Sequence, residues 1–303
     1  MYDVIIIGGG PAGITAGIYS ARLKLNTLLV TKEFGGQVGK KAVPIENYTG
    51  FKNIMGPELS KKMEEHLKSF DVDIEVDKVN EVKKTNGGFL VLTSGGKELK
   101  AKTVIVATGS DPRPLEVPGE KEFIGKGVSY CAVCDGPIFA GKTVVVIGGG
   151  NSGFETAQFM TKHAEKVYIL EYSKEVAADK TNQEIIKKAG NTEIITGAAL
   201  REIKGDNFVN SIIFEKEGEK KELDVQGVFV EIGYQPATAF VKGLVDFSET
   251  DEIIVDPLTG QTSTPGLFAA GDVNSGTFKQ IIIAAGEGAN AALAAFNYLK
   301  KNE

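Results

Sequence analysis

Two stretches of the chain, residues 1–23 and 143–163, share one pattern of apolar and polar positions. In each, a short apolar strand leads into a glycine-rich turn and then into a stretch of helical composition: residues 1–7, 8–13 and 14–23 in the first, and residues 143–147, 148–153 and 154–163 in the second. Such a strand–turn–helix unit is typical of an α/β domain. The pattern therefore predicts a duplicated α/β unit.

A second repeat supports the first. Residues 103–109, an apolar strand ending in Ala-Thr-Gly, resemble residues 227–233, which end in Glu-Ile-Gly. Polar, alternating segments with glycines precede both strands, around residues 86–96 and 205–218, and predict β-hairpins. An internal repeat of this kind implies two similar α/β domains rather than one large sheet.

The C-terminal region adds one strand with an acidic end, within residues 264–272, and an Ala-rich helix from about residue 281 to 299. The second glycine motif has no counterpart to either, so we expect both to complete the first domain. The predicted fold is α/β, with two similar dinucleotide-binding domains of the three-layer ββα, Rossmann-like type, the second inserted into the first. The expected boundaries are 1–112 and 245–303 for the first domain and 113–244 for the second.

Composition narrows the class of protein. The 303 residues, 42% of them hydrophobic and 24% charged, are enough for two domains of an ordinary soluble protein. A net charge of -6 and a pI near 5.3 argue against nucleic acid or an anionic membrane as a partner. No apolar run reaches the roughly 18 residues of a membrane span. The first residues begin a strand without a leader, so we expect a cytoplasmic protein.

Cys131 and Cys134 are the two cysteines of the sequence, and Asp135 follows them directly. A two-residue spacing lets the thiols close a small disulfide ring and reopen it by exchange with another dithiol. In a reducing compartment such a disulfide is more typical of catalysis than of structure. A zinc site would need further ligands nearby, and inert core cysteines seldom form such a pair.

The glycines of both turns match the GxGxxG pattern. The first glycine makes the bend, the second lets the backbone approach a pyrophosphate, and the third lets the helix pack closely on the strand. One match alone equally fits a plain glycine-rich turn, but two matches in duplicated units favour two dinucleotide sites. Two such sites beside a dithiol suggest a nicotinamide and a flavin.

At this point the chain resembles the low-molecular-weight thioredoxin reductases, and most closely the C-terminal reductase part of the flavoprotein subunit of alkyl hydroperoxide reductase. The matching motifs run from Gly8 to about Leu299: the two glycine turns, Gly35-Gly36-Gln37, Glu46-Asn47-Tyr48, Ala107-Thr108-Gly109, Cys131 to Gly136, Ala270-Gly271-Asp272 and Phe278-Lys279-Gln280. The resemblance implies FAD in the first domain and a nicotinamide in the second, which carries the dithiol.

The resemblance also implies roles for single residues. Gly8, Gly10, Ala12 and Gly13 would contact the FAD pyrophosphate, and Asp272 the ribitol. The flavin would be lined by Gly36, Gln37, Asn47, Gln280 and Ile281, and the remaining expected FAD contacts are Pro11, Glu33, Thr108, Gly109, Gly271 and Lys279. The expected nicotinamide-nucleotide contacts are Gly148, Gly150, Asn151, Ser152, Gly153, Glu171, Ile232 and Gly233. Alternatively, Asp272 is a turn residue or helix cap, and Gln37 and Asn47 are ordinary loop residues.

Glu171 bears on the choice of nicotinamide. It follows the strand at residues 166–170 and lies 18 residues after Gly153, where a carboxylate can accept both hydrogen bonds of an adenosine ribose diol. A 2′-phosphate about 4 Å away would be repelled by roughly 4 kcal/mol at an effective dielectric near 20. We therefore predict NADH over NADPH, and the alternative is that Glu171 is only a solvated strand end.

The resemblance assigns the flavin contact to Cys134 and attack on an external partner to Cys131. Asp135 is the candidate proton donor and acceptor, provided that burial raises the pKa of its carboxyl; its alternative role is to cap a helix. Both histidines, His66 and His163, lie in polar helical stretches, where we expect a surface position.

The leading hypothesis is an NADH-dependent, FAD-containing reductase of the thioredoxin-disulfide reductase type. Because the nucleotide fold begins at Met1, we expect the partner to be a separate chain, namely a thioredoxin-, glutaredoxin- or peroxiredoxin-linked dithiol protein. Three alternatives remain open: a reductase with another donor (NADPH, ferredoxin or a deazaflavin), an NADH oxidase, and a nucleotide-binding redox sensor. The resemblance implies a homodimer, which is the expected assembly.

Overall fold

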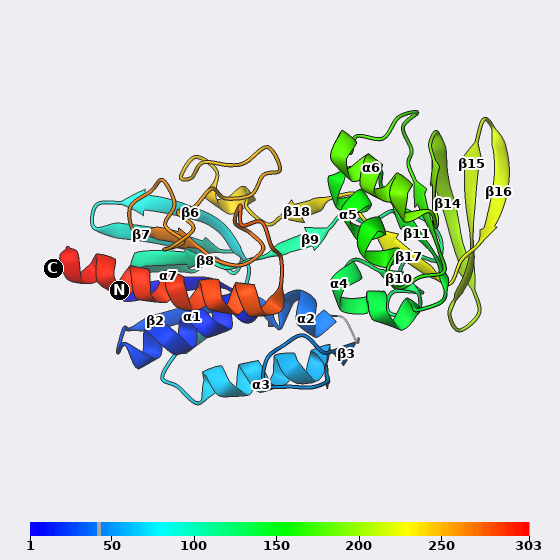
Figure 1. The fold of residues 1–303 in the computed structure, drawn as a ribbon. Coiled ribbons are helices and arrows are strands. Elements are labelled where there is room, and N and C mark those ends of the chain that lie inside the picture. The colour runs from blue at the N-terminus through cyan, green and yellow to red at the C-terminus, as the bar shows by residue number, and fades with distance from the viewer. Residues whose placement is uncertain (41–43, 303) are drawn as a thin grey trace. The chain divides into compact units, whose positions relative to one another are not determined.

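The computed structural model describes residues 1–40 and 44–302, apart from the side chains of residues 40, 44 and 133. It divides into unit 1, residues 1–111 and 234–303, and unit 2, residues 112–233 (Figure 1). The prediction that the second domain is inserted into the first is confirmed. The return crossing lies eleven residues earlier than the expected 244/245, because β18 (Tyr234–Pro236) already pairs with β9 (Ser110–Pro112).

The sheet of unit 1 is built around β1 (Tyr2–Gly9), which runs parallel to β2 (Thr27–Phe34) on one side and to β8 (Glu98–Val106) on the other. Residues 4–7 are almost fully buried, as a central parallel strand covered on both faces requires. The order is β5-β2-β1-β8-β7-β6, and β19 also pairs with β8. The outer strands are β5 (Asp73–Val76), β6 (Val79–Thr85), β7 (Gly88–Thr93) and β19 (Leu267–Ala269).

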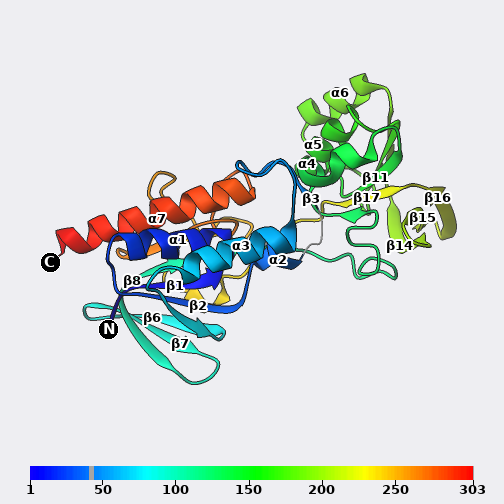
Figure 2. The same ribbon diagram turned by 90° about the horizontal axis from the view of Figure 1, so that it is seen from below.

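Alternate residues of β1 belong to two of the hydrophobic cores of unit 1. Val4 and Ile6 belong to the core that α1 (Pro11–Arg22) and α7 (Ile281–Lys301) cover, and α7 lies along α1 (Figure 2). Residues 5 and 7 belong to the opposite core, with the β6–β7 hairpin. The last strand and helix therefore complete the first domain, as predicted. The smaller elements are α2 (Gly36–Lys40), β3 (Pro44–Ile45), β4 (Ile54–Met55), α3 (Gly56–Lys68) and η2 (Ala239–Val241).

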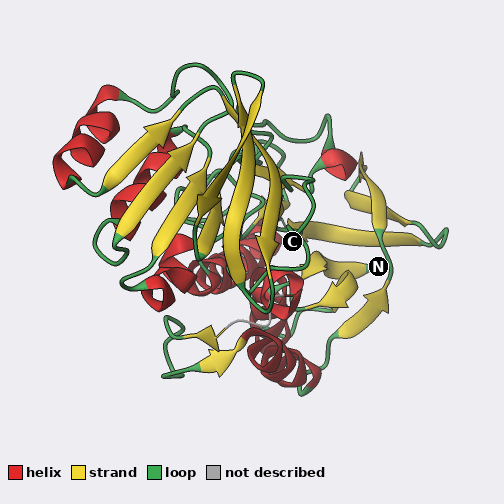
Figure 3. Cartoon of the chain, turned by 90° about the vertical axis from the view of Figure 1, so that its right-hand side faces the viewer, coloured by secondary structure: helices red, strands yellow, loops and turns green. Residues whose placement is uncertain are grey.

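Unit 2 also has a parallel sheet with helices on one face and antiparallel strands on the other, which makes three layers. Its parallel sheet has the order β10-β17-β11-β12-β13, and a separate antiparallel sheet has the order β14-β15-β16. Figure 3 shows the strands and helices of the chain by colour. One face of the parallel sheet packs on the antiparallel strands and the other on the helices. The elements are β10 (Val128–Ser129), α4 (Ala132–Asp135), η1 (Gly136–Phe139), β11 (Thr143–Ile147), α5 (Asn151–Met160), β12 (Lys166–Leu170), α6 (Lys180–Ala189), β13 (Thr192–Ile195), β14 (Ala198–Gly205), β15 (Val209–Lys216), β16 (Glu219–Asp224) and β17 (Gly227–Val230).

The sequence repeats correspond to structural repeats. β17 pairs with β11 as β8 pairs with β1, and the expected hairpins form β6–β7–β8 and β14–β15–β16. Both helices begin three residues earlier than predicted, because the third glycine of each motif lies inside the first turn of its helix. Among the described residues, no helix combines the length and the apolar character needed to span a membrane.

Candidate nucleotide sites and redox dithiol

In the glycine turn of unit 1, two of the glycines have no room for a side chain and the glycine between them has open space beside it. Gly8 has a φ of +121°, and a Cβ there would lie 2.2 Å from the Ala107 carbonyl oxygen. A Cβ at Gly13 would lie 1.9 Å from the Gly8 carbonyl oxygen, whereas one at Gly10 would meet no atom within 4 Å. Gly10 precedes α1 without a side-chain cap, so the N–H groups of the first turn are available to an anion.

Unit 2 has the same turn with nearly the same backbone angles. A Cβ at Gly148 would lie 2.3 Å from the Glu231 carbonyl oxygen, one at Gly153 would lie 1.9 Å from Gly148, and one at Gly150 would meet nothing. The φ and ψ of Gly150 are -82° and -178°, and those of Gly10 are -81° and -176°. Both turns fit the pyrophosphate of a dinucleotide.

Several residues expected at the flavin come together from distant parts of unit 1. The Asn47 side-chain amide donates to Oε1 of Gln280, 3.2 Å away and 233 positions along the chain. A Cβ at Gly271 would lie 3.0 Å from the Cβ of Ala12, so the segment that carries Asp272 passes directly over the glycine turn. The first contact joins Asn47 to Gln280, and the second places residues 271–272 at the start of α1.

Other expected flavin contacts lie at the edges of this region. The Gln37 side-chain amide donates to the Asp111 carboxylate, and the Thr108 hydroxyl donates to the Ala237 carbonyl oxygen at 2.9 Å. Gln37 and Thr108 therefore both contact residues where the chain leaves and re-enters unit 1. Glu33, near the end of β2, is exposed.

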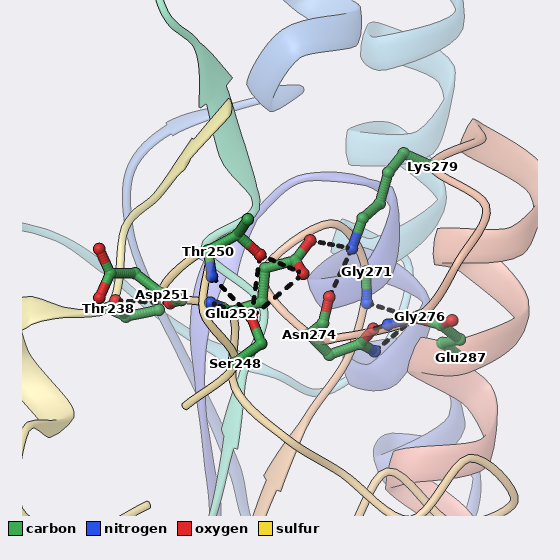
Figure 4. A network of polar contacts seen from close by, with 10 residues as sticks. All are labelled: Thr238, Ser248, Thr250, Asp251, Glu252, Gly271, Asn274, Gly276, Lys279 and Glu287. Atoms are coloured by element: carbon green, nitrogen blue, oxygen red, sulfur yellow. Dashed lines mark hydrogen bonds and ion pairs between the residues drawn. The ribbon is translucent and has the colours of Figure 1, made fainter. Parts of the chain in front are cut away.

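The side chain of Lys279 takes part in a polar network within unit 1 (Figure 4). Its ammonium lies 2.9 Å from Oε1 of Glu252 and donates to the backbone oxygen of Asn274. Oε2 of Glu287 accepts from the Asn274 amide at 2.8 Å and from the Gly271 N–H at 2.7 Å. The network fixes the loop between β19 and α7. Sequence reasoning missed its acidic members, although an acidic residue between two glycines in an Ala-rich helix was a usable signal for Glu287.

In unit 2, the carboxylate of Glu171 is held against the glycine turn. Oε2 accepts from the Gly149 N–H at 2.6 Å and Oε1 from the Ser173 N–H at 2.7 Å. A Cβ at Gly149 would lie 2.8 Å from Oε2 of Glu171. Glu171 is therefore an ordered part of the turn rather than a freely solvated strand end.

The other expected nicotinamide contacts border the same turn. Oδ1 of Asn151 accepts from the Asp179 N–H at 2.9 Å, which ties the start of α5 to the start of α6. Ser152 is exposed in the first turn of α5. Ile232 and Gly233 follow β17, and the Gly233 carbonyl oxygen accepts from the Arg113 N–H at 2.9 Å.

Cys131 and Cys134 form a disulfide with their Cα atoms 5.3 Å apart, and both residues are half-buried. The Cys134 N–H also donates to Sγ of Cys131 at 3.3 Å. Oδ2 of Asp135 accepts from the Ser129 hydroxyl at 2.5 Å. Asp135 precedes η1, but its side chain makes no capping hydrogen bond there. A hydrogen bond thus links the Asp135 carboxylate to Ser129, two residues before Cys131.

The two histidines differ in environment. His66 is exposed on α3, as predicted. His163 is half-buried, with its ring 4.8 Å from the ring of Phe159, so the expected surface position is wrong in part.

A family model described as pyridine nucleotide-disulphide oxidoreductase matches residues 2–288. The chain belongs to this family. Membership implies a flavin and a pyridine nucleotide as cofactors, and the two open glycine turns fit both.

Individual relatives agree with the family assignment. An NADH dehydrogenase of Bacillus subtilis is 45% identical over 99% of the chain, and the F subunit of an alkyl hydroperoxide reductase of Pseudomonas putida is 44% identical over 98%. The chain spans 59% and 58% of the length of these two proteins. The crystal structure of a thioredoxin reductase from Streptococcus pyogenes matches with a TM-score of 0.94 and 38% identity, covering 99% of each chain.

Unit 2 also has a buried carboxylate that sequence reasoning missed. Glu120 is 1% exposed, and it accepts from the N–H groups of Leu115 at 2.7 Å and Glu116 at 2.9 Å. It also accepts from the hydroxyl of Tyr130 at 2.5 Å. Burial, and then this hydrogen bond, raise the pKa of Tyr130, which stays neutral. Glu120 thus anchors the residue next to Cys131.

Glu231 is a second carboxyl that sequence reasoning missed. It follows β17 beside Gly148, and its Oε1 accepts from the Thr156 hydroxyl on α5 at 2.7 Å. Burial raises its pKa to about 7, opposed by the Thr156 hydrogen bond and aided by the nearby charge of Glu155. Glu231 lies at the carboxyl end of β17, next to β11, where the connections from neighbouring strands diverge. Doubly wound sheets bind ligands at such a position. No sequence signal distinguished Glu231 from an ordinary strand end.

Proposed function

We propose that the chain is an FAD-dependent disulfide reductase that passes electrons from NADH, through FAD and the Cys131–Cys134 disulfide, to a small dithiol protein of the thioredoxin type. The observation that carries the proposal is the half-buried disulfide with an acidic residue bonded into its segment, in a chain with two nucleotide turns. In this proposal unit 1 holds FAD and unit 2 holds the nicotinamide.

Bound FAD would supply two-electron chemistry between a hydride donor and a disulfide. In unit 1, the first turn of α1 would bind the pyrophosphate, and Asp272, Asn47 and Gln280 would orient the ribitol and the ring. The approach of Gly271 to Ala12 and the hydrogen bond between Asn47 and Gln280 support this arrangement.

The dithiol would transfer the electrons onward. Two electrons and two protons convert the disulfide into two thiols. The Cys131 thiolate then attacks the partner's disulfide, forming a mixed disulfide and releasing one partner thiolate. The Cys134 thiolate displaces the second partner sulfur and re-forms the Cys131–Cys134 bond. Asp135 would hold and return the protons that the thiolates give up and take back.

Two observations support NADH as the donor. The Glu171 carboxylate faces the glycine turn, where it would accept from a ribose diol and repel a 2′-phosphate. The relative from Bacillus subtilis bears the name NADH dehydrogenase. The partner remains a thioredoxin-, glutaredoxin- or peroxiredoxin-linked dithiol protein, and we expect a cytoplasmic homodimer.

The test is an anaerobic titration of the purified yellow protein with NADH, followed by addition of oxidised thioredoxin. We expect NADH to bleach the flavin absorbance and thioredoxin to restore it. The proposal fails if the protein cannot be loaded with FAD. It also fails if flavin reduced by NADH is reoxidised by none of the oxidised thioredoxin-, glutaredoxin- or peroxiredoxin-linked proteins.

The name of the same relative makes an NADH oxidase the second candidate. Cys131→Ser separates the two functions. In a disulfide reductase the variant loses reduction of thioredoxin. In an oxidase, oxygen consumption with NADH continues at the wild-type rate and wild-type protein reduces no disulfide.

A further inference from the structure

Ser129 lies where the dithiol segment leaves the parallel sheet of unit 2. It is the last residue of β10, opposite Phe229 of β17, and is 4% exposed. Its hydroxyl is 2.5 Å from Oδ2 of Asp135 and 3.0 Å from the backbone nitrogen of Cys131. A hydroxyl has one proton to donate and two lone pairs. The carboxylate and the N–H therefore use it in complementary ways, one as acceptor and one as donor. The Cys131 carbonyl oxygen, at 3.3 Å, is a second and more distant acceptor for the same proton.

The hydroxyl joins the two functional ends of the dithiol segment. The Asp135 N–H donates to the Cys131 carbonyl oxygen at 3.1 Å, so the backbone closes a turn around both cysteines. The Ser129 hydroxyl adds a side-chain bond across the same turn. Because Ser129 is buried, water cannot readily replace the hydroxyl if it is removed.

We propose that Ser129 is a positioning residue of the redox centre: its hydroxyl orients the Asp135 carboxylate relative to Cys131 and favours the ionised form of that carboxylate. The inference rests on the proposed disulfide reductase function and goes one step further, since it assigns to a buried serine the control of when the acidic residue holds its proton. A hydrogen bond donated to a carboxylate stabilises the ionised form.

Other ionisable groups lie near the dithiol segment and have to be separated from Asp135. The helical elements that pack against α4 are η1 and α5. η1 has no ionisable side chain, and the ionisable residue of α5 is Glu155. β10 carries none. Tyr130 and Glu120 precede the dithiol, and the ring of His163 stacks on Phe159, which lies beside Gly136. The Asp135→Asn background is therefore needed to assign a change in pH dependence to Asp135.

The test compares Ser129→Ala with wild type in the full-length, FAD-loaded protein. The rate of reduction of 5,5′-dithiobis(2-nitrobenzoate) with NADH is measured from pH 5.5 to 9. Ser211→Ala is the matched control, because Ser211 is also buried in unit 2 and its hydroxyl also donates to a carboxylate, Oε1 of Glu222 at 2.8 Å. We expect Ser129→Ala to lower the rate about tenfold at pH 7 and to move the profile to higher pH by about one unit. Ser211→Ala leaves the profile unchanged.

A second readout does not require turnover. The rate of iodoacetamide alkylation of Cys131 in the reduced chain is followed against pH in wild type, Ser129→Ala, Asp135→Asn and the double variant. We expect Ser129→Ala to shift the alkylation profile in wild type and to add nothing in the Asp135→Asn background. If wild type reduces no disulfide, the proposed function fails while alkylation still tests Ser129.

Three results would overturn the role of Ser129. The first is a profile that coincides with those of wild type and Ser211→Ala. The second is a lower rate with an unshifted profile, and the third is an equal effect of Ser129→Ala in both backgrounds, since either means that the serine acts only on the fold.

Discussion

Glu171 and Glu231 follow the two strands that flank β11, yet their carboxyl groups meet different surroundings. Glu171 accepts two backbone N–H groups, from Gly149 and Ser173. Glu231 is largely buried and accepts from one hydroxyl, so its pKa is raised to about 7. At the scale of single residues, one carboxylate is suited to select a ligand and the other to respond to pH.

Removing the charge of Glu171 should weaken the discrimination between the two nicotinamides. In Glu171→Gln the amide oxygen still accepts one N–H, but the repulsion of a 2′-phosphate is lost. We expect the ratio of kcat/KM for NADH to that for NADPH to fall at least about tenfold. Glu175→Gln, an exposed change in the same unit, should leave the ratio unchanged. A wild-type preference for NADPH would contradict the prediction.

The raised pKa of Glu231 should make unit 2 less stable as the pH rises. The unfolded chain has the ordinary glutamate pKa near 4.5, so the folded form binds more protons between that value and 7. The contribution of Glu231 to the free energy of unfolding is therefore most favourable below pH 4.5. It falls as the pH rises through 7, by on the order of 3 kcal/mol at pH 8.

Thermal unfolding of the protein without nucleotide checks this at pH 5.5 and pH 8. Glu231→Gln should raise the melting temperature at pH 8 and reduce its pH dependence, because the amide oxygen can still accept from Thr156. Glu175→Gln again serves as the control. Equal pH dependence in Glu231→Gln and wild type would show that other groups dominate.

At the scale of elements, short segments depend on buried side chains for their position. β10 and α4 contain few residues and little apolar surface of their own. Glu120 binds two backbone N–H groups of the segment that enters unit 2, together with the Tyr130 hydroxyl beside Cys131. One buried carboxylate thus links the entry segment to the dithiol segment.

Breaking this link should destabilise unit 2 in two steps. Tyr130→Phe removes one donor and should lower the free energy of unfolding by about 1–2 kcal/mol. Glu120→Ala leaves two N–H groups and a hydroxyl unsatisfied, and should lower it by about 3 kcal/mol or more. Urea unfolding measures both effects. Tyr172→Phe, at a side chain that is 79% exposed, should change the stability little; similar losses in all three variants would refute the role of Glu120.

The elements were largely predictable because their signals are local. β11 and β12 have the predicted bounds, since an apolar run ending at glycine or at a charged residue defines a buried parallel strand. The boundary of the inserted unit was less predictable, because the pairing of β9 with β18 joins residues more than 120 positions apart. The roles of Ser129, Glu120 and Glu231 depend on such distant or buried contacts, and composition and spacing do not reveal these.

At the scale of the whole molecule, the chain order makes the two units unequal. Unit 2 is continuous, and both of its hydrophobic cores consist of its own residues. Unit 1 needs both ends of the chain, since Phe268 of β19 and the alanines of α7 complete the core below α1. Folding of unit 1 must therefore wait for the C-terminal segment.

Expression of each unit by itself tests whether unit 2, but not the N-terminal part of unit 1, folds alone. Residues 112–233 alone should unfold cooperatively on heating, as followed by circular dichroism. Residues 1–111 alone should not, whereas 1–111 joined to 234–303 by a short Gly-Ser linker should regain cooperative unfolding, because β9 and β18 are neighbouring strands. Cooperative unfolding of residues 1–111 without β19 and α7 would contradict this account.

The near-identical backbone angles at Gly10 and Gly150 have a consequence for inhibition. In the proposed function both turns bind a pyrophosphate, and two turns of the same backbone geometry cannot distinguish one adenine dinucleotide from another. Selectivity must then come from the parts of each ligand beyond the phosphates. ADP lacks those parts, so it should compete with the dinucleotide at both sites with similar affinity. An inhibitor selective for one site would have to extend toward the flavin ring or the nicotinamide.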